Sequence, residues 1–350
     1  MKNYLVTGGA GFIGSNYVLY MLNKYNDVKI INLDALTYAG NLENLKAVKN
    51  NSNSIFVEGN ICNRELVSNL FKEYNFDYVV NFAAESHVDR SIIEPEIFAK
   101  TNVMGTVNLL NCAKDSWYTE ESGWRDGVKY IQVSTDEVYG SLGDKGFFTE
   151  ATPLDPHSPY SSSKAGADLM VKAYRDTFKM PINITRCSNN YGPYQFPEKL
   201  IPLLINNCLE LRDLPIYGDG LNIRDWVYVE DHCKAIDMVL RNGRVGEVYN
   251  VGGHNERTNL QVAKKVISYL HDNVSEGITE SLIKYVEDRK SHDRRYGIMP
   301  NKIKEELGWY PETTFEVGIE KTIKWYLDNK EWMNNVTSGD YQKYYEKMYK

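Results

Sequence analysis

Long apolar runs are missing from this sequence of 350 residues, and no stretch reaches the length that a helix needs to cross a bilayer. The N-terminus also lacks the pattern of a signal peptide. An excess of positive charge is missing as well, because the formal net charge is −7. The sequence therefore argues against a general nucleic-acid binder, which needs clustered Lys and Arg. A small phosphorylated ligand in a locally basic pocket stays compatible with it.

Cysteine is scarce, and its five residues are too scattered to form a CxxC pair. They are Cys62, Cys112, Cys187, Cys208 and Cys233. The six histidines likewise form no HExxH or other metal-binding spacing. We therefore expect no disulfide framework and no metal site. Scattered thiols are typical of a reducing compartment, so the cytoplasm is the expected location.

Short apolar segments alternate with helical stretches in the first part of the chain. The expected strands lie within residues 4–6, 28–34, 54–61, 78–86 and 130–140. Such alternation predicts an α/β fold with a Rossmann-type, doubly wound parallel sheet. After Asn190 the alternation weakens, which predicts a smaller C-terminal α/β domain that closes over the crevice and binds the substrate.

Three glycines, Gly8, Gly11 and Gly14, follow the first expected strand, and a helix opens near Phe12. Glycines there allow a tight turn and close approach of the backbone to a pyrophosphate. Asp34 ends the second expected strand, where a carboxylate can bond a ribose 2′-hydroxyl and would repel a 2′-phosphate. No Lys or Arg follows closely. A glycine cluster alone could be a loop, but the combination predicts a site for NAD rather than NADP.

Two adjacent carboxylates, Asp136 and Glu137, come just after another expected strand. Ligands of a doubly wound sheet gather at the carboxyl ends of its strands, so residues 83–86 and 134–137 should border the cofactor crevice. Two close carboxylates disfavour double ionisation, which raises one pKa and suits an acid–base pair. A charged loop at a strand end is the plainer alternative.

Tyr160 and Lys164 stand four residues apart at the start of a helical pattern, which places them on one helix face. A nearby ammonium should lower the pKa of the phenol and make it a usable base. Since the chain has 26 tyrosines, a surface Tyr and an unrelated surface Lys form the alternative. The position downstream of a dinucleotide-binding pattern favours the catalytic interpretation.

Several longer motifs carry a resemblance to a known family. They are "TGGAGFIG", "NFAAESHVDRS", "STDEVYG", "YSSSK", "SNNYGPYQFPEKLIP", "IRDWVYVEDH" and "YNVGGHNERTN". From about residue 3 to beyond Trp309, the chain resembles the dTDP-glucose 4,6-dehydratase family of the extended short-chain dehydrogenase/reductase superfamily. The resemblance implies an NAD-dependent hydro-lyase that acts on a sugar nucleotide, supplies deoxysugars of the rhamnose type for polysaccharides, and forms a homodimer.

The resemblance also implies a reaction in which NAD serves as an internal redox relay. Tyr160, helped by Lys164, would take the proton of the C4 hydroxyl during oxidation, and Thr135 would hydrogen-bond the same oxygen. Glu137 would then remove the C5 proton, while a protonated Asp136 would donate to the departing C6 hydroxyl. Return of hydride to C6 gives the 4-keto-6-deoxy sugar nucleotide.

Further site residues follow from the same resemblance. The cofactor would contact Gly8, Gly11, Phe12, Ile13, Gly14, Asp34, Ala35, Leu36, Thr37, Asn60, Ile61, Ala83, Ala84, Glu85, Ser86, Thr101, Tyr160, Lys164 and Asn190. The substrate would contact Ser86, Thr135, Asn189, Lys199, Leu200, Pro215, Ile216, Tyr217, Arg224, Asn259, His292, Asp293, Arg294, Arg295 and Tyr296. Arg224 could bond the diphosphate bidentately, and Arg294 and Arg295 would make the pocket locally positive. Ion pairs with neighbouring aspartates are the alternative for all three.

The expected division of the chain is a cofactor-binding domain over residues 1–188 and a sugar-nucleotide-binding domain over residues 189–350. Residues 225–255 are expected to return to the first domain. Helices near 100–114 and 160–178 would form the dimer interface implied by the resemblance.

The chain departs from the family pattern at two places. Asn60 stands where the family usually has Asp at the adenine amino group, and an amide oxygen can still accept a hydrogen bond there. Lys290 and Ser291 replace a usual Pro-Gly turn before "HDRRY", which could change how Arg294 and Arg295 are presented.

Three alternative functions stay open at this point. The same dehydration on a CDP- or UDP-sugar would need only a different base pocket. A sugar-nucleotide 4-epimerase would share the cofactor loop and the Tyr–Lys pair, but it has no use for an acid–base pair at C5–C6. A non-catalytic NAD-binding scaffold would need none of the catalytic side chains, all of which are present.

Overall fold

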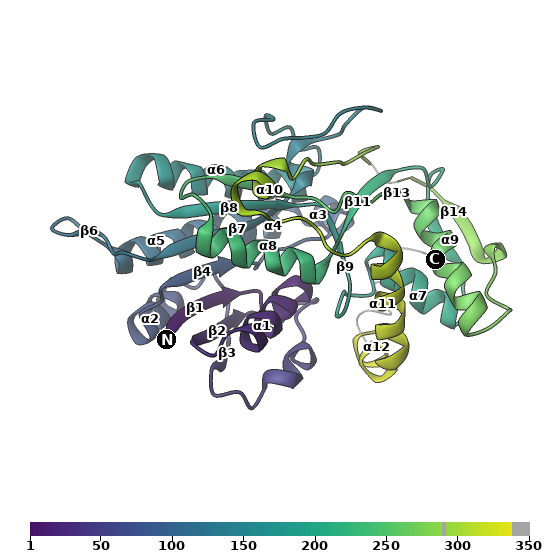
Figure 1. The fold of residues 1–350 in the computed structure, drawn as a ribbon, viewed down its shortest axis with the longest axis horizontal. Helices are drawn as coiled ribbons and strands as arrows, with labels where there is room; N and C mark the ends of the chain where they lie inside the picture. The colour runs from purple at the N-terminus through teal and green to yellow at the C-terminus, as the bar shows by residue number, and fades with distance from the viewer. Residues whose placement is uncertain (289–291, 338–350) are drawn as a thin grey trace.

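The computed structural model describes residues 1–288 and 292–337 (Figure 1). Its centre is a seven-stranded sheet in which every neighbouring pair of strands is parallel, in the order β12-β8-β7-β4-β1-β2-β3. The strands are β1 (Lys2–Thr7), β2 (Val28–Asp34), β3 (Ser54–Glu58), β4 (Tyr78–Asn81), β7 (Lys129–Thr135), β8 (Ile182–Cys187) and β12 (Val248–Val251). This confirms the predicted Rossmann-type α/β fold.

Helices cover both faces of the sheet, because its central strands are apolar on both sides (Figure 1). One face packs against α1 (Phe12–Lys24), η1 (Leu42–Val48), α8 (Val229–Asn242) and α10 (Asn301–Leu307). The other packs against α2 (Arg64–Tyr74), α5 (Thr106–Trp117) and α6 (Pro159–Phe178). Between β4 and α5 lie α3 (Val88–Ile93), α4 (Pro95–Phe98) and the π-helix η2 (Ala99–Gly105). A small hairpin joins β5 (Tyr118–Thr119) to β6 (Gly123–Trp124), and η3 (Asp136–Tyr139) follows β7.

The π-helix differs from the single helix expected near 100–114. Its wider turns carry Asn102, whose side chain accepts from Glu85 N (2.9 Å) and donates to Glu85 O (3.0 Å) and Ser163 Oγ (2.8 Å). These bonds tie the loop after β4 to helix α6. Local deformation of this kind is common at functional sites.

A second, smaller layer holds its own apolar core (Figure 1). It contains α7 (Leu200–Leu209), α9 (Asn259–Asn273), η4 (Glu280–Leu282), α11 (Phe315–Asp328) and α12 (Lys330–Val336). Its strands are β10 (Leu214–Tyr217) paired with β14 (Ile283–Val286), and β9 (Asn189–Tyr191), β11 (Ile223–Tyr228) and β13 (Glu256–Thr258) in one three-stranded sheet. The apolar stripes of residues 260–270 and 318–327 face this core.

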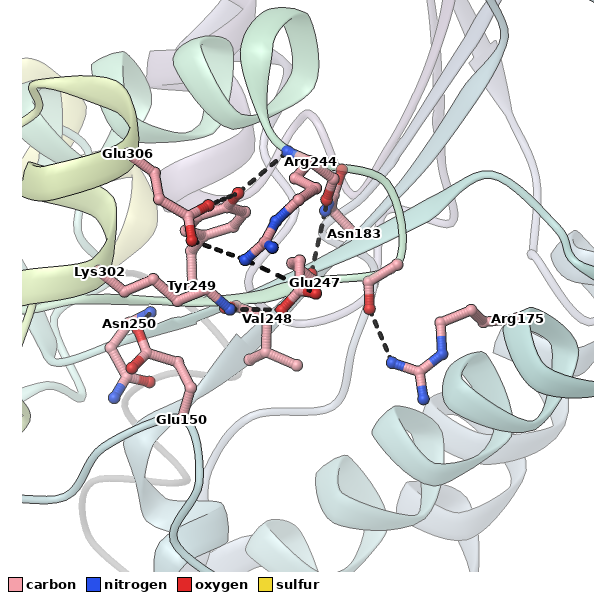
Figure 2. Close-up of polar contacts among 11 residues, drawn as sticks. Glu150, Arg175, Asn183, Arg244, Glu247, Val248, Tyr249, Asn250, Lys302 and Glu306 are labelled. Carbon is pink, nitrogen blue, oxygen red and sulfur yellow. Dashed lines mark hydrogen bonds and ion pairs between the residues drawn. The ribbon is translucent and has the colours of Figure 1, made fainter.

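A polar network fastens the edge strand β12 to α10, as Figure 2 shows. Lys302 Nζ donates to Glu247 Oε2 (2.6 Å), and Tyr249 OH donates to Glu306 Oε2 (2.7 Å). Arg244 pairs with Glu306 Oε1 at 2.7 Å. The network holds a late segment of the chain on the edge of the large sheet.

No helix of residues 1–288 and 292–337 has the length and apolar character to cross a membrane.

Lys129 on β7 provides a test of this packing. Its ammonium is 8% exposed and donates to Gly243 O (2.8 Å) at the end of α8, and burial lowers its pKa to about 8. In the unfolded chain a lysine titrates near pH 10.4, so the unfolded state binds more protons between those values. The free energy of unfolding should therefore rise with pH across that window, by about 3 kcal/mol in total.

The variant Lys129→Met should lose this rise, because Met carries no proton. Urea unfolding of both proteins between about pH 7 and pH 10 would measure the difference. Equal slopes of unfolding free energy against pH in the two proteins would contradict the assignment.

Candidate active site

The loop between β1 and α1 is shaped by glycine. Gly8 has φ +71°, and a Cβ there would lie 2.6 Å from Ala83 N on the loop after β4. A Cβ on Gly14 would meet the carbonyl oxygen of Gly8, so the helix can pack on the loop only without a side chain. The close approach of these backbones leaves the N-terminus of α1 open toward the strand ends, where a phosphate is favoured.

Asp34 closes β2 beside this loop. Its carboxylate accepts from Ala10 N (2.9 Å) and Leu36 N (2.9 Å). Burial raises the pKa of Asp34, and these backbone donors oppose the rise. The side chain therefore holds the glycine loop and also faces the cavity that opens at the strand ends.

A long cavity runs along the carboxyl edge of the sheet from Asp34 on β2 to Cys187 on β8. β2 and β8 are four positions apart in the sheet, and this separation is about 19 Å at the usual strand spacing. The predicted cofactor residues that line this cavity are Gly8, Gly11, Phe12, Ile13, Gly14, Asp34, Ala35, Thr37, Asn60, Ile61, Ala83, Ala84, Glu85, Ser86, Thr101, Tyr160, Lys164 and Asn190. Leu36 does not line the cavity, because its side chain packs against the apolar core between the large sheet and helices α1, α8 and α10.

The five predicted catalytic residues also line this cavity. Thr135 ends β7 and caps the short helix η3, since its Oγ1 accepts from Glu137 N (3.3 Å). The same hydroxyl donates to Asp136 Oδ1 (3.3 Å). Ser158 and Ser161 form a capping box at the start of α6, which places Tyr160 in its first turn and Lys164 one turn later.

Asp136 is 1% exposed, and its environment suits an acid. Burial raises the pKa of this carboxyl well above its usual range, and the nearby charge of Glu137 raises it further. Asp136 therefore holds its proton to a higher pH than an exposed aspartate does. Glu137 is only half-buried and lines both this cavity and a second one.

The Tyr160–Lys164 pair differs from the expectation of a lowered phenol pKa. Burial and the carboxylate of Glu137 raise the pKa of Tyr160 well above 10. Lys164 Nζ donates to Val133 O (2.8 Å), and burial lowers the pKa of the ammonium. Unless a further positive charge binds near Tyr160, its phenol stays protonated and acts as a proton donor.

A second cavity opens between the large sheet and the smaller layer. The predicted substrate residues that line it are Ser86, Asn189, Lys199, Leu200, Pro215, Ile216, Tyr217, Arg224, Asn259, His292, Asp293 and Tyr296. Thr135 lines the cofactor cavity instead. Five residues line both cavities and so mark their junction: Ser86, Glu137, Asn189, Glu198 and Lys199.

Arg224 supplies a buried cation to the second cavity. Its Nη2 donates to Asp293 O (2.9 Å), and the guanidinium lies 4.3 Å from the ring centroid of Tyr296. The carboxylate of the neighbouring Asp225 accepts from Gly253 N and Asn255 N (both 2.7 Å).

Arg294 and Arg295 are not brought to either cavity, which corrects the expectation that they line the substrate site. Arg294 forms an exposed ion pair with Asp219 (2.8 Å). Arg295 is buried against Glu256 (2.6 Å) and also donates to two loop carbonyls. The residues face carboxylates that lie far away in the sequence.

The two departures from the family pattern have different outcomes. Asn60 lines the cofactor cavity, and its Oδ1 accepts from Cys62 N (2.8 Å) in a local turn. Lys290 and Ser291 lie outside the described residues.

Comparison with known proteins agrees with this geometry. The family model described as GDP-mannose 4,6 dehydratase matches residues 5–322. A curated dTDP-glucose 4,6-dehydratase from Xanthomonas campestris pv. campestris (strain B100) is 52% identical over 345 residues, 98% of each chain. The chain belongs to the dTDP-glucose 4,6-dehydratase family.

Solved members of this family share the fold. The Bacillus anthracis dTDP-glucose 4,6-dehydratase, in complex with NAD, has 53% identity and a TM-score of 0.86, covering 96% of this chain and all of that one. The Streptomyces venezuelae enzyme, also with NAD bound, has 46% identity and a TM-score of 0.88, covering 95% and 99%. These matches confirm the family that the sequence motifs indicated.

Sequence reasoning missed several residues of this dehydratase-family site. Tyr38 and Phe196 come from distant segments, and their rings meet edge to face at 5.9 Å beside the cofactor cavity. Glu198, whose pKa is raised by burial, stands at the junction of the cavities. The available signal was its place next to Lys199 in the motif "FPEKLIP"; no pattern in the sequence pointed to Tyr38.

Proposed function

We propose that this protein dehydrates dTDP-glucose to dTDP-4-keto-6-deoxyglucose with NAD as a regenerated cofactor. The observation that carries the proposal is the place of Glu137, which lines both cavities beside the buried Asp136, whose pKa is raised by burial. A base and an acid at the junction suit removal of a proton and of a hydroxyl from adjacent carbons.

The residues of the first cavity fit NAD. A glycine loop at a helix N-terminus suits the pyrophosphate, and Asp34 suits an unphosphorylated ribose. When bound, NAD supplies a reversible acceptor for two electrons and carries a positive charge in its oxidised form. That charge would favour the phenolate of Tyr160, which burial and the charge of Glu137 oppose.

Tyr160 would accept the proton of the C4 hydroxyl as the sugar is oxidised there. Lys164 lies one helical turn further on and would stabilise the phenolate. The hydroxyl of Thr135 reaches Asp136, and it would also orient the C4 oxygen.

Glu137 would then take the C5 proton, which the new C4 carbonyl acidifies. Asp136 would give its proton to the C6 hydroxyl, which leaves as water. After reduction at C6, Glu137 would return a proton to C5. The net change is the loss of one water, and no electrons are gained or lost overall.

The second cavity would hold the nucleotide. Arg224 would provide positive charge for the diphosphate, and the ring of Tyr217 would lie beside the nucleotide base. Lys199 Nζ lies 2.9 Å from Ser86 O at the junction. Among the residues that the structure describes, Lys199 and Arg224 are the lysine and arginine that line this cavity.

The test is incubation of the purified protein with dTDP-glucose and with CDP-, UDP- and GDP-sugars in heavy water, followed by mass spectrometry. We expect loss of water and uptake of one deuterium at C5 with dTDP-glucose. Dehydration of a CDP-, UDP- or GDP-sugar but not of dTDP-glucose would support the mechanism and overturn the assignment of the nucleotide. A protein that binds NAD but dehydrates none of these sugars would overturn the proposed function.

We further propose a homodimer. Two large apolar side chains are exposed on neighbouring helices: Met104 on η2 and Leu169 on α6. Pairing of two copies through α5, η2 and α6 would cover them. Light scattering at micromolar concentration should give twice the mass of the chain, and a monomer would contradict this interface.

We also propose that residues 1–188 and 225–255 act as the cofactor unit and the rest of residues 189–350 as the sugar-nucleotide unit, apart from α10, which packs against the large sheet. Membership of β12 in the seven-stranded sheet supports the return of the chain to the first unit. The cytoplasm is the proposed location, since the five cysteines are free thiols and four of them are buried.

Asn60 gives a prediction specific to this chain. In Asn60→Asp, one carboxylate oxygen can keep the bond from Cys62 N, while the other replaces the amide NH₂ and faces the cavity. A charge-assisted bond to the adenine amino group is roughly twice as strong as a neutral one. NAD should therefore bind about three- to tenfold more tightly by calorimetry. Weaker or unchanged binding would show that residue 60 does not accept from the adenine.

A further inference from the structure

His232 lies behind the cofactor cavity and does not line it. The residue stands in the first turn of α8, directly after β11, and is 0% exposed. Its Nδ1 lies 2.9 Å from Asn190 Oδ1, and β9, which carries Asn190, pairs with β11. Its Nε2 is buried without a hydrogen-bond partner among residues 1–288 and 292–337.

The surroundings of Asn190 determine which way its amide faces. The nitrogen Nδ2 lies 3.0 Å from Ser188 O, and a carbonyl oxygen can only accept. The NH₂ group must therefore face Ser188, which leaves the amide oxygen facing His232. An oxygen there needs a donor, so the proton of the imidazole sits on Nδ1.

The same amide continues the hydrogen bonds toward the reactive end of the cavity. Asn190 Nδ2 also donates to Cys187 Sγ (3.3 Å), and the Cys187 thiol donates to Ser134 O (3.4 Å). Ser134 directly precedes Thr135. The bonds thus run in one direction, from α8 across the ends of β9 and β8 to the end of β7, and Asn190, Cys187 and Ser134 all line the cofactor cavity.

A flipped amide would place NH₂ against the N–H of His232 and oxygen against the carbonyl of Ser188, so both contacts would repel. Burial lowers the pKa of His232 to about 3, which keeps the ring neutral under ordinary conditions. The imidazole therefore acts as a constant donor and not as a switch.

We propose that His232 is a positioning residue for NAD, which locks the amide of Asn190 and, through it, the wall formed by Asn190, Cys187 and Ser134 at the Tyr160 end of the cavity. This inference rests on the proposed binding of NAD. It assigns no contact between His232 and the cofactor.

Two substitutions separate positioning from packing. Asn in His232→Asn can place an NH₂ donor near the position of Nδ1, whereas Gln in His232→Gln places it near Nε2. Gln fills more of the pocket, so a role in packing alone would make His232→Gln the better protein. Binding of NAD to the full chain is measured by calorimetry, and thermal unfolding of each variant is recorded beside it.

We expect His232→Gln to weaken NAD binding roughly tenfold, as for the loss of one buried hydrogen bond, and His232→Asn to stay within about threefold of the wild type. The opposite order, or equal affinities in all three proteins, would overturn the inference. A wild-type protein that binds no NAD would overturn the proposed function itself.

A measurement on the unmodified protein covers the case in which a variant does not fold. Nitrogen-15 NMR should report a neutral His232 with its proton on Nδ1 between about pH 5 and pH 9. A proton on Nε2, or titration of the ring in that range, would overturn the inference without any use of NAD.

Discussion

Asp136→Asn should lower the rate of dehydration of dTDP-glucose by about 10²- to 10⁴-fold, the usual contribution of a positioned general acid. The amide has the shape of the acid but cannot give a proton to the departing hydroxyl. Proton removal at C5 depends on Glu137 and should continue, so recovered substrate should still gain deuterium in heavy water. Mass spectrometry of substrate and product measures both rates.

The pH dependence provides a second readout of the same residue. Because burial and Glu137 raise the pKa of Asp136, the wild type should lose activity as pH rises through that raised pKa. Asp136→Asn should lose this alkaline limb. Glu137→Gln is the matched control, since it should remove deuterium uptake and dehydration together. If both variants exchanged C5 equally, the roles of acid and base would be misassigned.

Asp168→Asn should destabilise the fold by about 3–5 kcal/mol, the usual cost of leaving a buried charge without its partner. Asp168 on α6 lies 2.8 Å from Arg186 Nε on β8, and both side chains are 0% exposed. Arg186 also lies 4.8 Å from the ring centroid of Tyr139 on η3. Urea unfolding should show a lower midpoint with an unchanged slope.

The same helix supplies a matched control. Asp176 pairs with Arg175 at 2.7 Å, but its side chain is 64% exposed. Asp176→Asn should leave the urea midpoint nearly unchanged, because water and salt screen such pairs. The double variant Asp168→Leu with Arg186→Met should recover much of the loss, since it leaves no buried charge. A similar loss in Asp168→Asn and Asp176→Asn would show that burial of the pair is unimportant.

Features that depend on neighbouring residues were predictable from the sequence. The apolar run 28–34 is a strand with those bounds, and the helix after the glycine loop begins at Phe12, as expected. The glycine spacing acts within a few residues, and Asp34 reaches the glycine loop within the predicted strand–helix–strand unit, where its carboxylate accepts from Ala10 N. Parallel strands then bring their carboxyl ends to one edge, which explains why most predicted site residues line the two cavities.

Features that depend on distant partners were not predictable. Arg295 pairs with Glu256, and Lys164, one turn from Tyr160, donates a hydrogen bond to the carbonyl of Val133. The pKa of the Tyr160 phenol is raised by burial and by the charge of Glu137. A pKa of this kind depends on how deeply the group is buried, and a local sequence pattern does not reveal the depth of burial.

The way in which β12 and α10 complete the large sheet has a consequence for synthesis on the ribosome. Val251 on β12 and Trp309 after α10 belong to the same apolar core as Tyr4 and Val18 at the start of the chain. Contacts of such long sequence separation form slowly, and the first core cannot close until about residue 309 has left the exit tunnel. A nascent chain that stops at residue 188 would expose the edge of β8, so premature termination should yield aggregating fragments and not a free cofactor-binding domain.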